Sequence, residues 1–272
     1  MSGVITIRRN DDAEQVELTT TTTGLDLFGD DRSVVAMRVN GESRDLQREL
    51  SDGDTVEPIL IDEPEGLSIV RHSAAHVTAQ ALQNLFADAK LGIGPPITDG
   101  FYYDFQTSPL TPEDMKSIEK RMGQIVKEKQ RFVRRVVTDD EARAELADEP
   151  FKLELISDKG SASADDGSSV EVGAGDLTIY DNVRRDGSVA WKDLCRGPHV
   201  PNTGYLGNGW ALTRTSAAYW RGDQSKADLQ RVYGTAWPTK DELQAYKTRL
   251  EEAAKRDHRK LGQELDLFSF HE

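Results

Sequence analysis

Apolar and polar residues alternate in short runs through the first sixty residues, which is the pattern of half-buried strands. The expected strands cover residues 4–8, 15–18, 33–39, 44–46 and 55–61. A brief helix is expected over residues 24–28, and tight turns at residues 10–12 and 40–41. This arrangement predicts a small β-grasp, ubiquitin-like module over residues 1–62.

A polar segment at residues 62–66 contains both proline and glycine, so we place a domain boundary there. Ser68 is expected to cap the next helix, and Thr111, followed by Pro112, is expected to cap another. Helices are expected over residues 69–86, 112–129 and 138–147, and strands over residues 101–105 and 132–137.

The residue pattern in the second half of the chain predicts mainly strands. One segment that is poor in apolar residues interrupts this series of strands. Expected strands cover residues 151–156, 177–183, 188–194, 211–214, 217–223 and 230–237, and a charged helix covers residues 239–261. Residues 158–175 are mostly Ser, Gly, Ala and Asp, which favours a flexible insertion. The expected class is α+β, with a β-grasp domain at 1–62, a mixed α/β domain at 63–238 and a helix at 239–272 that leads into something longer.

The composition narrows the class of protein. The 272 residues carry a formal net charge of −14 and are 37% hydrophobic, which suits a soluble protein of two domains. No apolar run approaches the ~20 residues that span a bilayer, and the first residues lack a secretion signal. The single cysteine excludes an internal disulfide, so we expect a cytoplasmic protein. The acidity argues against nonspecific nucleic-acid binding, although one local basic face is a candidate for RNA contact: Lys116, Lys120, Arg121, Lys127, Lys129, Arg131, Arg134 and Arg135.

The scarce residue types gather in two short segments. Three of the five histidines and the cysteine form the pattern HxxxH … CxxxH, made of His72, His76, Cys195 and His199. The first two histidines are four residues apart and share one face of a helix, whereas residues 196–198 form a turn that can aim Cys195 and His199 at one point. Such a set is suited either to binding a zinc ion in tetrahedral geometry or to forming a metal-free polar cluster that transfers protons. The alternative is that the two segments never meet.

Seven segments together carry a resemblance to a known family. They are residues 71–76 (RHSAAH), 93–95 (IGP), 100–104 (GFYYD), 193–202 (DLCRGPHVPN), 217–223 (AAYWRGD), 233–237 (YGTAW) and 251–262 (EEAAKRDHRKLG). With these segments the chain resembles the amino-terminal half of bacterial-type threonyl-tRNA synthetases. The resemblance implies a TGS domain at 1–62, an editing domain at 63–238 and a linker helix at 239–272 that leads to an absent class II catalytic core.

The implied activity is proofreading. Threonine and serine differ by one methyl group, which gives only ~1–3 kcal/mol of discrimination, so a second pocket must remove serine attached in error. The resemblance implies that this chain hydrolyses the ester of seryl-tRNA(Thr) and spares threonyl-tRNA(Thr). The full-length enzyme would ligate threonine to tRNA(Thr) with ATP.

The resemblance also implies roles for five catalytic residues. His72 is expected to position or deprotonate the attacking water, and Lys152 to supply a cation near that water or the leaving ribose oxygen. Asp193 is expected to hold the substrate ammonium, and His76 and His199 to orient water and the terminal adenosine.

Four more residues are expected to bind the substrate. Tyr103 and Gly94 are expected to line the pocket, and Arg196 to contact the substrate nearby. Cys195 is expected to lie beside the substrate without acting as a covalent nucleophile.

Residue type and resemblance disagree about metal. Residue type alone favours zinc at His72, His76, Cys195 and His199, whereas the threonyl family edits without metal and the alanyl relative binds zinc with this pattern. Four protein ligands would leave no open position for water. We therefore expect editing without a cofactor, with ATP and zinc confined to the absent catalytic core.

The expected partner is tRNA(Thr) charged with serine, without a membrane. The parent enzyme is expected to be a homodimer through the absent core, and the fragment alone a monomer. Two alternatives remain open. A zinc-dependent hydrolase would lose activity with a chelator and ignore tRNA, and a non-catalytic tRNA-binding module would bind tRNA without deacylating it.

Overall fold

The structure is a computed structural model that describes residues 3–9, 12–18, 21–159, 167–173 and 175–255. Most of the expected turn at residues 10–12, part of the expected insertion and the end of the last helix lie outside these ranges. The structure is a mixed α/β fold with several sheets, which agrees with the class expected from the sequence.

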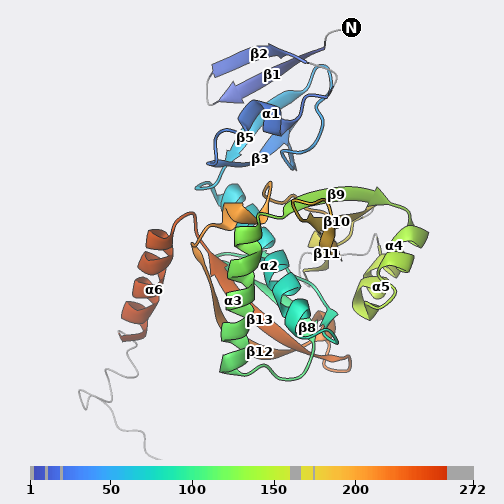
Figure 1. The fold of residues 1–272 in the computed structure, drawn as a ribbon, viewed down its shortest axis with the longest axis vertical. Coiled ribbons are helices and arrows are strands. Elements are labelled where there is room, and N and C mark those ends of the chain that lie inside the picture. Colours follow the sequence, from blue (N-terminus) through green and yellow to red (C-terminus); the bar gives the residue numbers. More distant parts are fainter. Residues whose placement is uncertain (1–2, 10–11, 19–20, 160–166, 174, 256–272) are drawn as a thin grey trace, which may run out of the picture.

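The first sixty residues form a five-stranded sheet with the order β2-β1-β5-β3-β4 (Figure 1). Its elements are β1 (Val4–Arg9), β2 (Asp12–Glu17), α1 (Gly24–Phe28), β3 (Val34–Val39), β4 (Glu42–Arg44) and β5 (Thr55–Leu60). β1 runs parallel to β5, and the other neighbours are antiparallel. Alternation places Ile5, Met37 and Val56 on the face that packs against Phe28. The expected strands are confirmed, with β2 beginning three residues earlier than expected, at Asp12 of the expected turn, and β4 beginning two residues earlier.

Helix α2 (Pro64–Leu85) runs through the centre of the molecule. Every residue from 69 to 82 is buried, and the alanines among them allow close packing on β8 and β13 on one side and on helix α3 on another. The expectation that Ser68 caps this helix is wrong. Pro64 occupies the first turn after Glu63, because proline needs no hydrogen-bond acceptor there.

Two further sheets flank α2. One has the order β12-β13-β8-β6, with β7 also paired to β8, and the other has the order β11-β10-β9. Their strands are β6 (Lys90–Leu91), β7 (Pro96–Ile97), β8 (Gly100–Gln106), β9 (Arg131–Val137), β10 (Leu177–Val183), β11 (Val189–Leu194), β12 (Trp210–Tyr219) and β13 (Asp228–Ala236). Helix α3 (Pro112–Glu128) begins at the expected Thr111 cap and packs beside α2. The remaining elements are α4 (Asp139–Glu145), α6 (Lys240–Lys255), η2 (Thr203–Leu206) and η3 (Trp220–Gly222), the last of which replaces the end of the strand expected at 217–223.

The strand expected over residues 151–156 is wrong, because this segment is helix α5 (Pro150–Ser157). Its buried positions, Phe151, Lys152, Leu155 and Ile156, recur at the spacing of one helical face. Pro150 in the first turn is a helix-start signal that outweighs the apparent alternation.

The expectation of a flexible insertion is wrong for residues 167–173. Residues 167–173 contain a 3₁₀ turn, η1 (Ser168–Val170), followed by the buried residues Glu171 and Val172. Val172 joins an apolar cluster with Leu155 and Leu177, so this segment packs despite its polar surroundings. Among the described residues, no helix has the length and apolar character needed to cross a membrane.

Candidate functional site

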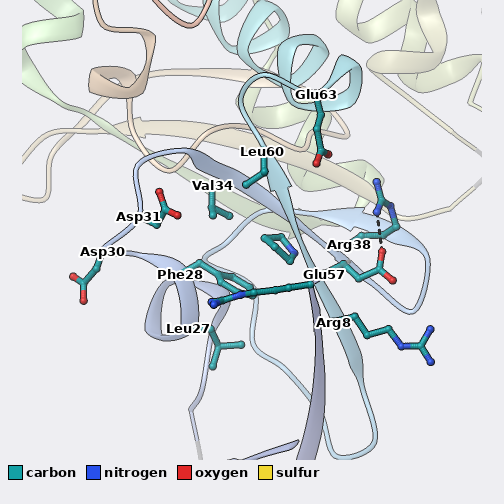
Figure 2. A pocket seen from close by; sticks show the side chains of 12 residues that line it. Arg8, Leu27, Phe28, Asp30, Asp31, Val34, Arg38, Glu57, Leu60 and Glu63 are labelled. Carbon is teal, nitrogen blue, oxygen red and sulfur yellow. Dashed lines mark hydrogen bonds and ion pairs between the residues drawn. The ribbon is translucent and has the colours of Figure 1, made fainter. Parts of the chain in front are cut away.

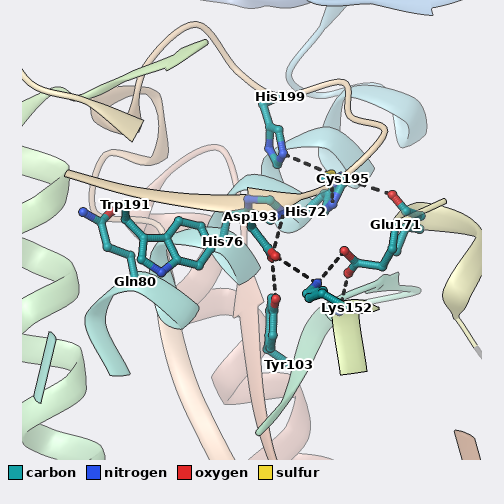
Figure 3. Close-up of polar contacts among 12 residues, drawn as sticks. His72, His76, Gln80, Tyr103, Lys152, Glu171, Trp191, Asp193, Cys195 and His199 are labelled. Atoms are coloured by element: carbon teal, nitrogen blue, oxygen red, sulfur yellow. Dashed lines mark hydrogen bonds and ion pairs between the residues drawn. The ribbon is translucent and has the colours of Figure 1, made fainter. Parts of the chain in front are cut away.

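The two distant histidine segments meet in the interior (Figure 3). α2 supplies His72 and His76, and the turn that follows β11 supplies Cys195 and His199. One side-chain atom from each of the four lies within 4.8 Å of the others, and all four residues are buried. The Cys195 Sγ lies 3.3 Å from the His72 Nε2 and 3.5 Å from the His199 Nε2. The convergence expected from the spacing is therefore present.

The turn that carries His199 is held from two sides. The backbone N–H of His199 donates to Asp45 Oδ1 at 2.7 Å, and its Nδ1 lies 3.0 Å from the Ser73 hydroxyl. Because Ser73 donates its own proton to the Ile69 carbonyl, the network assigns the ring proton of His199 to Nδ1. The His199 Nε2 is then free to accept a proton on the side that faces Cys195.

A second polar group adjoins the histidines and is built around Lys152 (Figure 3). The Lys152 Nζ lies 2.7 Å from Glu171 Oε2 and 3.0 Å from Asp193 Oδ1. The Tyr103 hydroxyl donates to Asp193 Oδ2 at 2.5 Å, and His76 Nε2 lies 4.0 Å from that same oxygen. Lys152 and both carboxylates are buried, so one ammonium serves two acids away from water.

Burial and charge fix the ionisation of this group. Burial opposes the charge of Lys152, but Asp193 and Glu171 outweigh it and raise the pKa of the ammonium above its ordinary value. Burial raises the pKa of Glu171 to about 7 against the pull of Lys152, and it also raises the pKa of Asp193. Lys152 is therefore a permanent cation at neutral pH and no candidate for a general base.

The histidines and the cysteine are neutral for a related reason. Burial, with the nearby Lys152 charge, lowers the pKa of His72 to about 4, and burial holds the pKa values of His76 and His199 well below the ordinary value. Burial also raises the pKa of the Cys195 thiol. Neither ring nitrogen of His76 has a hydrogen-bond partner among the described residues, which leaves a buried polar group ready for a ligand.

Gly94 and Arg196, both expected to bind substrate, occupy different positions. A Cβ on Gly94 would lie 2.2 Å from the Tyr103 ring, so this glycine lets the ring pack against the backbone. The Gly94 N–H also donates to Glu171. The Arg196 side chain is exposed, and it donates to the Ser169 carbonyl rather than to the buried cluster.

Sequence reasoning missed three residues that shape the site. Glu171 lies in a segment poor in apolar residues, where the valines on either side of it were the available signal. Asp45 and Ser73 contact His199 across long sequence separations. Ser73 lies within the RHSAAH segment, which was the available signal for it, whereas nothing in the local pattern marks Asp45.

Two cavities of similar size differ in their relation to this cluster. One, of about 690 Å³, lies on the N-terminal sheet and is lined by residues of both charges, such as Arg8, Asp31 and Glu57 (Figure 2). None of the candidate residues lines it. The other, of about 700 Å³, lies between residues 42–48 and the turn that carries Cys195 and His199, so it borders the site.

Comparison with known proteins places this site in a family. Residues 172–233, which include Asp193, Cys195 and His199, match the family model described as threonyl and alanyl tRNA synthetase second additional domain. The chain is 63% identical to a threonine–tRNA ligase of Cutibacterium acnes over 273 residues, which cover 100% of the chain and 40% of that protein. The chain is homologous to the amino-terminal region of threonyl-tRNA synthetases.

Other threonine–tRNA ligases are similar to this chain to about the same degree. The threonine–tRNA ligase of Leifsonia xyli subsp. xyli is 66% identical over 249 residues, with 89% of the chain and 36% of the relative covered. That of Thermobifida fusca is 64% identical over 260 residues, with 94% and 39% covered. The chain thus spans at most about two fifths of the length of these relatives, and the family resemblance seen in the motifs is confirmed.

The donor set of this synthetase region fits a zinc ion. Three imidazoles and a thiol with S···N distances of 3.3 and 3.5 Å match the edges of a tetrahedral site, and the unpartnered His76 could supply the remaining nitrogen. The same set, left without metal, places neutral imidazoles beside a fixed cation.

Proposed function

We propose that this chain hydrolyses the ester bond of tRNA(Thr) charged with serine and spares threonyl-tRNA(Thr). The observation that carries the proposal is the buried Lys152 cation beside three neutral imidazoles. Ester hydrolysis needs a base for water, a positive charge for the developing oxyanion and a proton for the leaving oxygen. This cluster contains groups suited to each need.

In the proposed reaction, neutral His72 accepts a proton from water as the water oxygen bonds to the seryl carbonyl carbon. The Lys152 ammonium stabilises the oxyanion that forms. When the bond to the ribose oxygen breaks, the His72 imidazolium returns its proton to that oxygen, so serine and uncharged tRNA are released. His76 and His199 orient the water and the terminal adenosine.

Substrate selection falls to the pocket wall. Asp193 accepts the substrate ammonium, which is favoured because burial has already stripped water from that carboxylate. We assign the exclusion of the extra methyl of threonine to Tyr103, whose ring is held in place by close packing against Gly94. Cys195 keeps its proton because its pKa is raised, so it lines the pocket as a thiol and is not a nucleophile.

We propose that the reaction proceeds without metal. A zinc ion held by His72, His76, Cys195 and His199 would supply structural rigidity, because four protein ligands fill its coordination sphere.

The surroundings of the site are part of the proposal. Residues 1–62 would form a TGS domain, 63–238 the editing domain and 239–272 the linker to a class II core. The parallel pairing of β1 with β5 supports the first of these assignments. The parent enzyme would be a cytoplasmic, homodimeric ligase that uses ATP.

The direct test replaces the cation. Lys152→Ala should lower the single-turnover deacylation rate of seryl-tRNA(Thr) by about 100-fold or more, the usual effect of removing one oxyanion donor. Lys240→Ala is the matched control, since Lys240 is exposed at the start of α6 and lies outside the site. Near-UV circular dichroism checks that the variant folds, and His72→Ala provides a second variant. Wild-type rates for both site variants would contradict the proposal.

A further inference from the structure

The cavity of about 700 Å³ beside the site has walls from two parts of the chain. Arg44 and Arg48 come from the N-terminal sheet and the segment after β4, whereas Arg134 lies on β9 and Arg196 follows β11. The cavity therefore exists only because the N-terminal sheet packs against the rest of the molecule.

The charge inside this cavity is not balanced locally. Arg48 and Arg134 make no ion pair with any described acidic residue, although both are only half exposed. Arg48 and Arg134 line the same cavity. Burial lowers the pKa of Arg48, and repulsion from Arg134 and Arg44 lowers it further, with Asp45 offsetting part of this effect. Three acidic residues also line the cavity: Glu42, Asp45 and Asp176. Glu42 forms an ion pair with Arg44, and the Asp45 carboxylate accepts hydrogen bonds from the Tyr180 hydroxyl and the His199 N–H.

The cavity and the buried cluster share a wall. Tyr180 and Pro198 line the cavity, and the Tyr180 ring lies 4.6 Å from the His199 ring, measured between centroids. The Tyr180 hydroxyl donates to Asp45, which also accepts the His199 N–H. A ligand in the cavity is thus one side chain away from the histidines.

We propose that this cavity binds the backbone phosphates next to the 3′-terminal adenosine of the tRNA, with Arg48 and Arg134 as the clamp. The inference rests on the proposed function and adds the part of the chain that holds the RNA. Guanidinium groups match phosphate geometry with paired hydrogen bonds, and two mutually repelling arginines gain most when an anion separates them. The N-terminal sheet then supplies half of the phosphate site.

The test compares a substrate with phosphates to one without them. In the double variant Arg48→Ala/Arg134→Ala, the KM for seryl-tRNA(Thr) should rise about 10-fold or more at low salt. The slope of log KM against log salt should fall by about 1.4, because two phosphate contacts to a single strand are lost. The KM for 3′-seryl-adenosine, which has no phosphate, should change less than about two-fold. Arg185→Ala is the control, because Arg185 is exposed and lies outside the cavity.

Each outcome bears on a different claim. If the wild type hydrolyses neither substrate, the proposed function fails and takes this inference with it. If the wild type hydrolyses both and the double variant keeps the wild-type KM and salt slope for tRNA, only the phosphate clamp is overturned. An equal loss on both substrates also overturns it, since the arginines would then act through the shape of the turn.

Discussion

Glu171 is a buried residue whose ionisation lowers the stability of the folded protein near neutral pH. Its carboxyl is buried, and its pKa is raised from 4.5 to about 7. Between these values the folded state binds a proton that the unfolded state releases. The stabilisation that Glu171 contributes is therefore fully present below pH 4.5 and is lost as the pH rises through 7.

Glu171→Gln tests this reasoning, because glutamine mimics the protonated acid. The free energy of unfolding of the wild type, minus that of the variant, should fall by up to about 3 kcal/mol between pH 4.5 and 8. Urea unfolding at several pH values measures the difference. A difference that grew with pH would mean that the ion pair with Lys152 outweighs burial.

At the scale of one element, the turn that carries Cys195 and His199 depends on Gly197. Its φ is +72°, and a Cβ there would lie 1.9 Å from the Tyr180 hydroxyl oxygen. Gly197→Ala should therefore move Tyr180, weaken its bond to Asp45 and slow deacylation, besides the ~1–2 kcal/mol cost of a left-handed alanine.

Gly187→Ala is the matched control for this substitution. Gly187 also has a positive φ, +86°, but open space surrounds the Cβ position. Both variants should lose stability in thermal unfolding, and only Gly197→Ala should lose deacylation activity. Equal activity in the two variants would show that the contact with Tyr180 is unimportant.

Local patterns predict elements well where one signal dominates. The Thr111 cap followed by Pro112 gave the start of α3, and the alternation in residues 177–194 gave the β10–β11 hairpin. Residues 151–156 misled because Phe151, Leu153 and Leu155 alternate like a strand, whereas burial follows a helix. Two signals competed there, and the helix-start signal of Pro150 outweighed the alternation.

At the scale of the whole molecule, the pairing of distant segments was only partly predictable. Histidine and cysteine are scarce in this chain, and their clustering in two short segments predicted that His72, His76, Cys195 and His199 lie together. The contact of the N-terminal sheet with the site had no such signal, since Asp45 meets His199 across 154 residues. Arg32 also donates to the Gly204 carbonyl at 2.9 Å, and Gln47 to the Pro201 carbonyl at 2.8 Å.

These contacts make the site a property of the assembled chain. Val35 and Ile59 of the N-terminal sheet share one apolar cluster with Ile69 and Ala74 of α2, which also carries the histidines. Movement of the sheet would therefore disturb the helix that holds half of the cluster.

The most direct measurement sets seryl-tRNA(Thr) and threonyl-tRNA(Thr) side by side with this chain, with and without a chelator. We predict rapid release of serine, retention of threonine at the rate without protein, and no effect of the chelator. Equal hydrolysis of both, or of neither, would contradict selective proofreading, and loss of activity with the chelator would contradict a reaction carried by the side chains alone.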